Sequence, residues 1–295
     1  MPPHWSKIPS NNPKYVLDTL YNNRMIPIIQ FTKLNHTNPG KMYLNASHAE
    51  THLPTLRQFI KDNALGTITT GIQSSSYPFL QSSHIPWIID VADDSSETEL
   101  GTLRGHIARQ NPQAKAMIES ANSIRPEGSS GAIQLKDEVL VLFTGPVHHY
   151  VTPKWYTETK PATGKVVPTW NYSAVQAYGK VTVYVDTNAA ESTEFLSSQI
   201  DALSRHAETS IMGYTGGEKL NPWEVADAPD RYIALLQKAI MGIKVDITRL
   251  EGKFKMSQEM NKGDREGVIE GFDKLGTDVG KEMSESVRVR HEAKS

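Results

Sequence analysis

Hydrophobic and polar residues alternate along several stretches of the chain, most clearly over residues 172–185. One face of this stretch carries Val175, Ala177, Val181, Val183 and Val185, and polar or aromatic residues occupy the other. A period of two over this length, rich in β-branched side chains, predicts a half-buried strand. Gly179 in its middle indicates a bulge or the close approach of another backbone.

Further strands are predicted at residues 66–72, 79–91, 102–108 and 242–250. Residues 138–143, EVLVLF, are continuously apolar, which predicts a strand buried on both faces. The Ser-, Gly- and Pro-rich residues 121–137 before it predict a loop.

Helices are predicted at residues 51–63, 111–121, 232–240 and 264–276, and in the charged tail. Asn111 suits the N-cap and Pro112 the first turn of the second of these helices. Because most strands follow one another without helices between them, we expect an α+β fold, an antiparallel barrel with peripheral helices.

The amino-acid composition excludes only a few classes of protein and of functional site. The 295 residues are 38% hydrophobic and 22% charged, as in ordinary globular proteins, and no apolar run is long enough to span a bilayer. The absence of cysteine excludes disulfides, thiol nucleophiles and cysteine-based metal sites. It also fits a reducing compartment, so we expect a cytoplasmic protein, with the nucleus as the second option.

The charge is distributed unevenly. Residues 1–41 carry five Lys or Arg and one acidic residue, which leaves 26 basic and 32 acidic residues in 42–295. We therefore expect no direct DNA binding by this mildly acidic part. Residues 1–41 are predicted to be a disordered extension, and residues 42–295 to form the working domain, with a helical subregion from about residue 187.

The stretch LRGHIARQNPQAK, residues 103–115, is the most informative candidate site. It places His106 and Arg109 on a strand that leads directly into the helix capped by Asn111, and Lys115 lies one turn further on. A helix N-terminus beside a guanidinium favours a phosphate or carboxylate. The alternative is that Arg109 pairs with an acidic residue such as Glu119.

Ser82, Ser83 and His84 lie on a neighbouring predicted strand. Their polar groups either complete a phosphate cage or face solvent. His148 and His149 fall on opposite faces of one strand, so they do not bind one metal together, and no metal site is predicted. No acid–base pair stands out, so the catalytic residues are unknown.

Trp170, Asn171 and Tyr172 lie at the beginning of the strand predicted around residues 172–185. Their aromatic surfaces and amide group can hold a planar polar ligand, or they can pack as a barrel corner.

Several stretches together resemble one known family. These are SSHIPW, GHIARQNPQ, EVLVLFTGPVHHYVTPKWY, VPTWNYSAVQAYG, GIKVDITRLEGKFKMSQ and GDREGVIEGF, and they span about residues 42 to 290. In this order they resemble the PaiB-type family of FMN-binding proteins, also called negative transcriptional regulators, in its fungal style. The resemblance implies a split β-barrel of the flavin-reductase and pyridoxamine-phosphate-oxidase type, a homodimer with FMN at the subunit interface.

The resemblance also implies roles for individual residues. Trp170, Asn171 and Tyr172 would line the flavin cleft or the dimer seam. Arg109, with Ser82 or Ser83 and the helix start at Asn111, would bind the FMN phosphate, and His106 would lie near the ribityl chain. Residues 154–156 and 255–258 would make secondary contacts.

Four functions follow as alternatives. The first is an FMN-binding homodimer with oxidoreductase activity, and the second is a regulator that acts through a partner protein or a sensed ligand. The third is a haem-binding barrel that uses His84, His106, His148 or His149. The fourth is a structural dimer without a ligand.

Overall fold

The computed structural model describes residues 44–126 and 131–292, and the predicted extension 1–41 lies outside these residues. The strands are β1 (Ala49–Glu50), β2 (Leu65–Gly71), β3 (Leu80–Asp90), β4 (Thr102–Ala108), β5 (Ala132–Thr144), β6 (His149–Val151), β7 (Thr169–Tyr184) and β8 (Ile240–Lys255). The α-helices are α1 (Leu53–Asp62), α2 (Pro112–Ile124), α3 (Thr159–Thr163), α4 (Ala190–His206), α5 (Asp230–Ala239), α6 (Lys262–Asp273) and α7 (Asp278–Glu292). Short helical turns are η1 (Pro153–Trp155), η2 (Ala207–Ile211) and η3 (Val225–Asp227).

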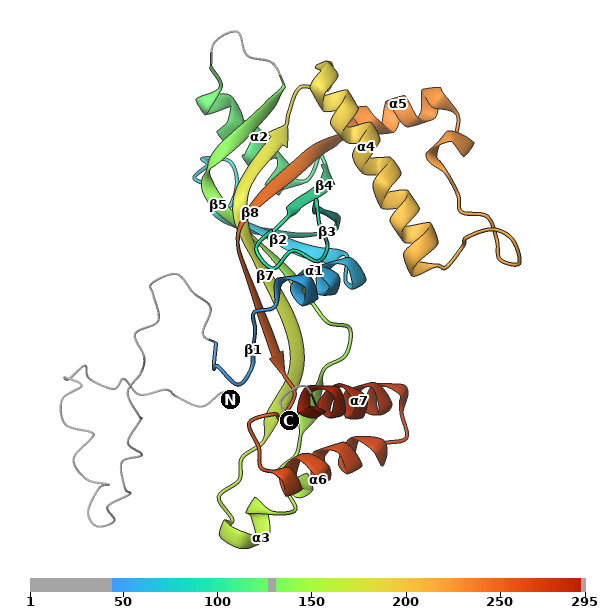
Figure 1. Cartoon of the computed structure of the whole chain (residues 1–295). Coiled ribbons are helices and arrows are strands. Elements are labelled where there is room, and N and C mark those ends of the chain that lie inside the picture. Colours follow the sequence, from blue (N-terminus) through green and yellow to red (C-terminus); the bar gives the residue numbers. More distant parts are fainter. Residues whose placement is uncertain (1–43, 127–130, 293–295) are drawn as a thin grey trace, which may run out of the picture. The chain divides into compact units, whose positions relative to one another are not determined.

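Six antiparallel strands close into a barrel (Figure 1). They follow the order β8-β4-β3-β2-β5-β7, and β7 pairs again with β8 to complete the ring, while β1 and β6 add to its edges. The inner face holds the valines predicted for 172–185, together with Ile68, Trp87 and Ile243. The predicted α+β fold with an antiparallel barrel is therefore confirmed.

Two amphipathic helices cover opposite ends of the barrel. Leu56 and Ile60 of α1 enter the core beside the beginning of β2, and Ala114 and Met117 of α2 enter it at the other end of that strand. The side chain of Gln113 fixes α2 there, because its Nε2 donates to the Ile68 and Gln81 carbonyls and to Thr70 Oγ1.

The long strands β7 and β8 meet across a bulge at Gly179. The pairing shifts between Tyr178 and Gly179, and a Cβ added at Gly179 would lie 2.3 Å from the Asp246 carbonyl oxygen. The predicted bulge and the predicted close backbone approach are both present.

Two predictions for the middle of the chain were wrong. The predicted loop 121–137 contains the end of α2 and the beginning of β5, because β5 continues to Ala132 through an irregularity between Gln134 and Glu138. The stretch 138–143 is not buried on both faces. Val139, Val141 and Phe143 face the core, whereas Leu140 and Leu142 remain partly exposed on the outer face.

A second, smaller core lies beside the beginning of β7 and the end of β8. It contains Val151, Tyr156, Met256, Val268, Phe272, Met283 and Val287, contributed by β6, the turn after η1, α6, α7 and the residue after β8. We call the part of the chain around this core the small subdomain (Figure 1).

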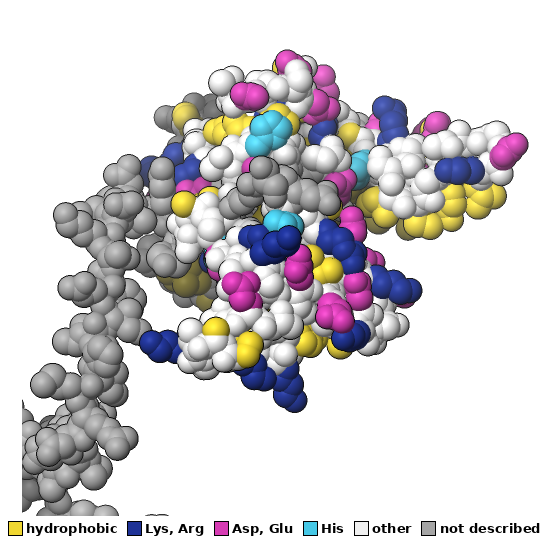
Figure 2. Space-filling view, turned by 60° about the horizontal axis from the view of Figure 1, so that its bottom comes forward, with side chains coloured by type: hydrophobic (Ala, Val, Ile, Leu, Met, Phe, Trp, Pro, Cys, Tyr) yellow, Lys and Arg dark blue, Asp and Glu magenta, His cyan; other side chains and the backbone are white. Residues whose placement is uncertain are grey.

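The helical region between β7 and β8 is only partly packed. α4 lies against β3, β4 and β8. The predicted amphipathic helix 232–240 exists as α5, but Tyr232, Leu235 and Leu236 of its apolar face are exposed. Ile211, Met212, Leu220 and Trp223 before it are exposed as well, and Figure 2 shows hydrophobic side chains gathered along one side of this region.

Candidate flavin-binding surface

The outer face of β2, β3 and β5 carries two rows of side chains, which we call the hydroxyl rows. The strand register gives His84, Thr67 and Leu142 in the first row, and Ser82, Thr69 and Leu140 in the second. Thr69 Oγ1 and Ser82 Oγ share a hydrogen bond of 2.8 Å. Ser82 and His84 are exposed, and the other four are partly exposed. The surface therefore presents three hydroxyls and an imidazole to a ligand.

The beginning of α2 contacts the same strand, β3, from the opposite face, at Ser83, which lies between Ser82 and His84 and pairs with the buried Ile68. Asn111 Nδ2 donates to Ser83 Oγ at 3.0 Å, and Asn111 Oδ1 accepts from the Gln113 amide at 2.8 Å. Asn111 is the predicted N-cap and Pro112 is the first helical residue. The first turn contains no acidic side chain, so the positive end of the helix dipole is not neutralised. Such a helix start favours a phosphate group, and the Ser83 hydroxyl is the one bonded to its N-cap.

An apolar groove continues the surface one row beyond His84 and Thr67. Leu65 pairs with Pro86 in β2 and β3, and together with Thr144 they form the barrel side of a cavity of about 560 Å³. Leu203 of α4 and Ala207 and Ile211 of η2 form the other side, and residues 62–64 at the end of α1 also line the cavity with one acidic and one amide side chain. Leu65 and Ile211 are each 63% exposed. A flat apolar group fits between these walls better than a charged one.

Arg109, His106 and Lys115 make their contacts with other elements. Arg109 Nη1 donates to the Val185 carbonyl at 3.0 Å, whereas Glu119 accepts from Ser74, so the described residues do not show the alternative Arg109–Glu119 pair. His106 Nδ1 lies 2.6 Å from Oε1 of the buried Gln199 in α4. Lys115 is partly exposed on α2.

The residues at the beginning of β7 form a separate group. Trp170 is exposed and its Nε1 lies 3.3 Å from His148 Nδ1, while the buried Asn171 hydrogen-bonds with Ser257 at 3.0 Å. Tyr172 lies two, four and six residues before the β7 residues that pair with Thr144 of the groove and with Leu142 and Leu140 of the two rows. At the usual strand rise these separations are about 7, 13 and 20 Å. One chain therefore presents two separate groups of predicted site residues.

Each of the four histidines that are candidate haem ligands contacts a different part of the protein. His84 belongs to the hydroxyl rows, His106 contacts Gln199, His148 contacts Trp170, and the His149 ring lies against the Tyr150 carbonyl. In residues 44–126 and 131–292 no group of three or more His, Asp or Glu side chains is arranged to hold a metal. In the same part of the chain, no helix has the length and hydrophobicity to cross a membrane.

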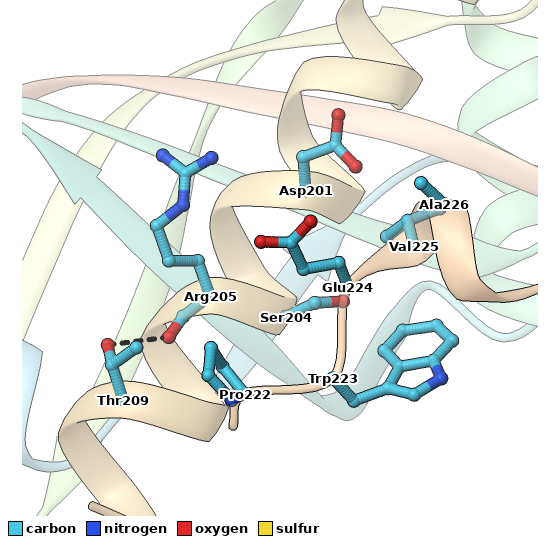
Figure 3. A pocket seen from close by; sticks show the side chains of 9 residues that line it. All are labelled: Asp201, Ser204, Arg205, Thr209, Pro222, Trp223, Glu224, Val225 and Ala226. Carbon is cyan, nitrogen blue, oxygen red and sulfur yellow. Dashed lines mark hydrogen bonds between the residues drawn. The ribbon is translucent and has the colours of Figure 1, made fainter. Parts of the chain in front are cut away.

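Another pocket, of about 360 Å³, lies between α4 and the segment 222–226 (Figure 3). Asp201 and Arg205 project from α4 on one side, and Trp223 and Glu224 lie on the other. No barrel strand contributes to this pocket, and none of the predicted site residues lines it.

Sequence reasoning missed Thr67, Thr69 and the apolar groove. The alternation of Thr67 and Thr69 with Ile68 in GTITTG was a usable signal, since it places both hydroxyls on the outer face of a strand. The groove had no such signal, because its walls come from segments far apart in the sequence, residues 62–65, 86, 144 and 203–211.

Comparison with known proteins gives the family. Residues 42–249 match the family described as "Putative FMN-binding domain". A relative in Aspergillus fumigatus, of unknown function, is 63% identical over 258 residues, which cover 86% of this chain and 99% of the relative. The Bacillus subtilis "Protease synthase and sporulation protein PAI 2" is 25% identical over 244 residues, which cover 83% of this chain and 95% of that protein.

Among solved structures, the FAD and heme binding protein from Mycobacterium smegmatis is similar with a TM-score of 0.39 and 13% identity, over 70% of this chain and 73% of that one. The family match covers well over half of the chain and includes every residue of the candidate surface. The chain therefore belongs to this family of FMN-binding domains, and FMN is its cofactor.

Proposed function

We propose that the protein is a homodimeric, FMN-dependent oxidoreductase that holds the flavin along the outer face of β2 and β3. The observation that carries the proposal is the outer face of β2 and β3, where the hydroxyl rows lead into the groove lined by Leu65 and Pro86. Ser82 and Thr69 would hold the phosphate, and the positive end of α2, bonded to the opposite face of β3 at Ser83, would attract it. Leu65, Pro86 and Ile211 would contact the ring.

The spacing supports this orientation. Ser82 and Pro86 are four residues apart on β3, which corresponds to about 13 Å along a strand. This span suits a ribityl chain between a bound phosphate and a bound ring, with Thr67 and His84 beside it. The neutral hydroxyl donors and the positive helix end, whose first turn has no acidic side chain, favour the dianionic phosphate.

Bound FMN would supply hydride or single-electron transfer. The chain's own residues would anchor and orient it. The hydroxyl rows donate hydrogen bonds, and the walls of the groove exclude water from one side of the bound group. Among the described residues of this surface we assign no acid or base.

A second copy would complete the site. Leu140 and Leu142 remain partly exposed on the outer sheet face, where a second copy can cover them. Tyr172 lies about 13 to 20 Å along β7 from the two hydroxyl rows, and we propose that Trp170 and Tyr172 approach the flavin from the partner subunit. Sedimentation velocity should give twice the chain mass of 32.8 kDa. A monomer that retains FMN would contradict the dimer but not the cofactor site.

The first test is the visible absorption spectrum of protein purified without added cofactor. The paired bands of oxidised flavin, released on heating, are expected. A sharp Soret band would replace FMN with haem, and a colourless protein that does not bind added FMN would contradict the proposal.

The second test concerns the phosphate end. Ser82→Glu places a negative charge there, and Ser82→Gln is its neutral match; Ser82 is exposed, so both variants should fold. We expect FMN affinity to fall by at least about tenfold in Ser82→Glu relative to Ser82→Gln. Riboflavin, which has no phosphate, should bind both variants alike. Equal FMN affinity in the two variants would place the phosphate elsewhere.

A further inference from the structure

A separate cavity of about 480 Å³ lies in the small subdomain, beside the beginning of β7 and the end of β8. Its walls are formed by Tyr156, Thr159, Lys165, Val166, Val167, Pro168, Thr169, Lys255, Glu259, Met260, Asn261 and Asp264. None of these residues belongs to the hydroxyl rows or to the apolar groove, so the cavity is distinct from the proposed flavin surface.

The acceptor groups of this cavity already have partners. Asp264 Oδ1 accepts from the backbone amides of Glu158 and Thr159 at 2.9 and 3.0 Å. Asn261 caps α6 through its Oδ1 and donates to Thr159 Oγ1. The carboxylate of Glu259 lies 2.9 Å from His48 Nε2, and its other oxygen lies 3.9 Å from Lys255 Nζ.

One hydrogen-bond donor of this cavity, in contrast, has no partner within the described chain. Tyr156 is only 5% exposed, and its hydroxyl has no hydrogen-bond partner among the described residues. Buried hydroxyls almost always have a partner, so this one indicates a missing acceptor. Burial, with smaller contributions from the charges of Glu259 and Asp264, raises the pKa of Tyr156 to about 12, so the hydroxyl stays protonated and can donate.

Lys255 supplies the positive charge. Its ammonium group donates to Thr169 Oγ1 and to the Trp170 carbonyl, and its side chain is 16% exposed. Its one acidic neighbour, Glu259, lies closer to His48 than to Lys255. The Lys255 ammonium group is therefore able to pair with an anionic oxygen of a ligand in the cavity.

The remaining wall is apolar. Val166, Val167, Pro168 and Met260 contribute hydrocarbon surface, and Lys165 adds an exposed cation. A ligand that fits has one acidic end with acceptor oxygens and an apolar body.

We propose that this cavity binds a small carboxylic acid with an apolar body, such as an aromatic monocarboxylate. The Lys255 ammonium pairs with the carboxylate, the Tyr156 hydroxyl donates to it, and Val166, Pro168 and Met260 pack against the body of the ligand. This site shares no residue with the hydroxyl rows or the apolar groove, and its occupation requires no FMN.

The test is isothermal titration calorimetry of the full chain with benzoate, with benzamide as the neutral match. Benzoate should bind, and benzamide should bind at least about tenfold more weakly because it has no charge to pair with Lys255. Tyr156→Phe, which removes one hydroxyl at constant shape, should weaken benzoate binding about tenfold. Tyr150→Phe, at an exposed tyrosine of the same subdomain, is its control and should leave the affinity unchanged.

A second pair of variants avoids the buried position. Val167 is 74% exposed at the cavity wall, so Val167→Glu and Val167→Gln should both fold. Val167→Glu should weaken benzoate binding by several-fold relative to Val167→Gln through charge repulsion. The FMN content should be the same in all variants, which separates this proposal from the flavin site. An absence of benzoate binding, or equal affinity in Tyr156→Phe and the unmodified protein, would overturn the proposal and leave water as the occupant.

Discussion

Asn111 Nδ2 donates to Ser83 Oγ at 3.0 Å while the Oδ1 atom of the same side chain caps α2. A single amide group thus fixes both the first residue of a helix and the position of a hydroxyl on β3. The two roles need different atoms, so substitutions can separate the stability of the helix from the binding of a phosphate.

Asn111→Asp keeps a capping oxygen but adds a negative charge beside Ser83. We expect the free energy of unfolding to stay within about 0.5 kcal/mol, because Asp and Asn cap equally well. FMN affinity should fall about tenfold through repulsion of the phosphate. Urea denaturation and fluorescence titration with FMN measure the two effects.

Asn111→Ala gives the complementary result. The loss of the cap should lower the free energy of unfolding by about 1 kcal/mol, with a smaller effect on FMN than in Asn111→Asp. If Asn111→Asp binds FMN as tightly as the unmodified protein, the phosphate does not lie at this helix start.

Gln113 holds the same helix to the barrel. Its Nε2 donates to three acceptors of β2 and β3, and the side chain is 1% exposed. Gln113→Met preserves the volume but leaves these acceptors without that donor, so unfolding should become easier by about 2–3 kcal/mol. Lys115→Met, on a partly exposed position of α2, should change stability by less than about 0.5 kcal/mol. Equal effects in urea denaturation would show that the Gln113 contacts add no stability.

Much of this region could be predicted from sequence because its signals are local. Asn111 and Pro112 mark the beginning of α2 within two residues, and alternation predicted β4 at the bounds that the structure has. Local signals also placed Ser82, Ser83 and Asn111 in elements that prove to be neighbours.

Contacts between distant segments could not be predicted in this way. The EVLVLF stretch appeared buried on both faces, but Leu140 and Leu142 are only partly buried, and hydrophobicity alone does not report which face is covered. The hydrogen bond from Arg109 to the carbonyl of Val185, 76 residues away, had no signal in the sequence either. Such a contact depends on where β7 ends in the closed barrel.

The apolar groove allows a prediction that distinguishes the two ends of the flavin. Leu65→Ser removes hydrocarbon from the groove and should weaken FMN and riboflavin alike, by about fivefold. Because Leu65 is exposed, the variant should fold normally. Leu80→Ser, at an equally exposed leucine at the beginning of β3, should leave both affinities unchanged. If Leu65→Ser weakens the binding of FMN but not of riboflavin, the phosphate and not the ring lies at the groove, and the flavin is bound in the reverse orientation.

Asp264 makes the small subdomain sensitive to acid. Burial would raise the pKa of its carboxyl, but hydrogen bonds from Thr159 and from the amides of Glu158 and Thr159 outweigh burial and hold the pKa below 3.8. A pKa that is lower in the folded than in the unfolded chain adds stability above the unfolded value, and this stability is lost as the pH falls through the folded value.

Asp264→Asn should therefore lower the free energy of unfolding by about 1–3 kcal/mol at pH 6, where the native carboxylate is charged. The difference between the two proteins should shrink as the pH falls below 3.8, because the unmodified carboxyl then becomes neutral as well. Urea denaturation between pH 6 and pH 3 measures it, with the exposed Asp278→Asn as a control that should show no such trend. A difference that stays constant over this range would mean that the hydrogen bonds of Asp264 do not depend on its charge.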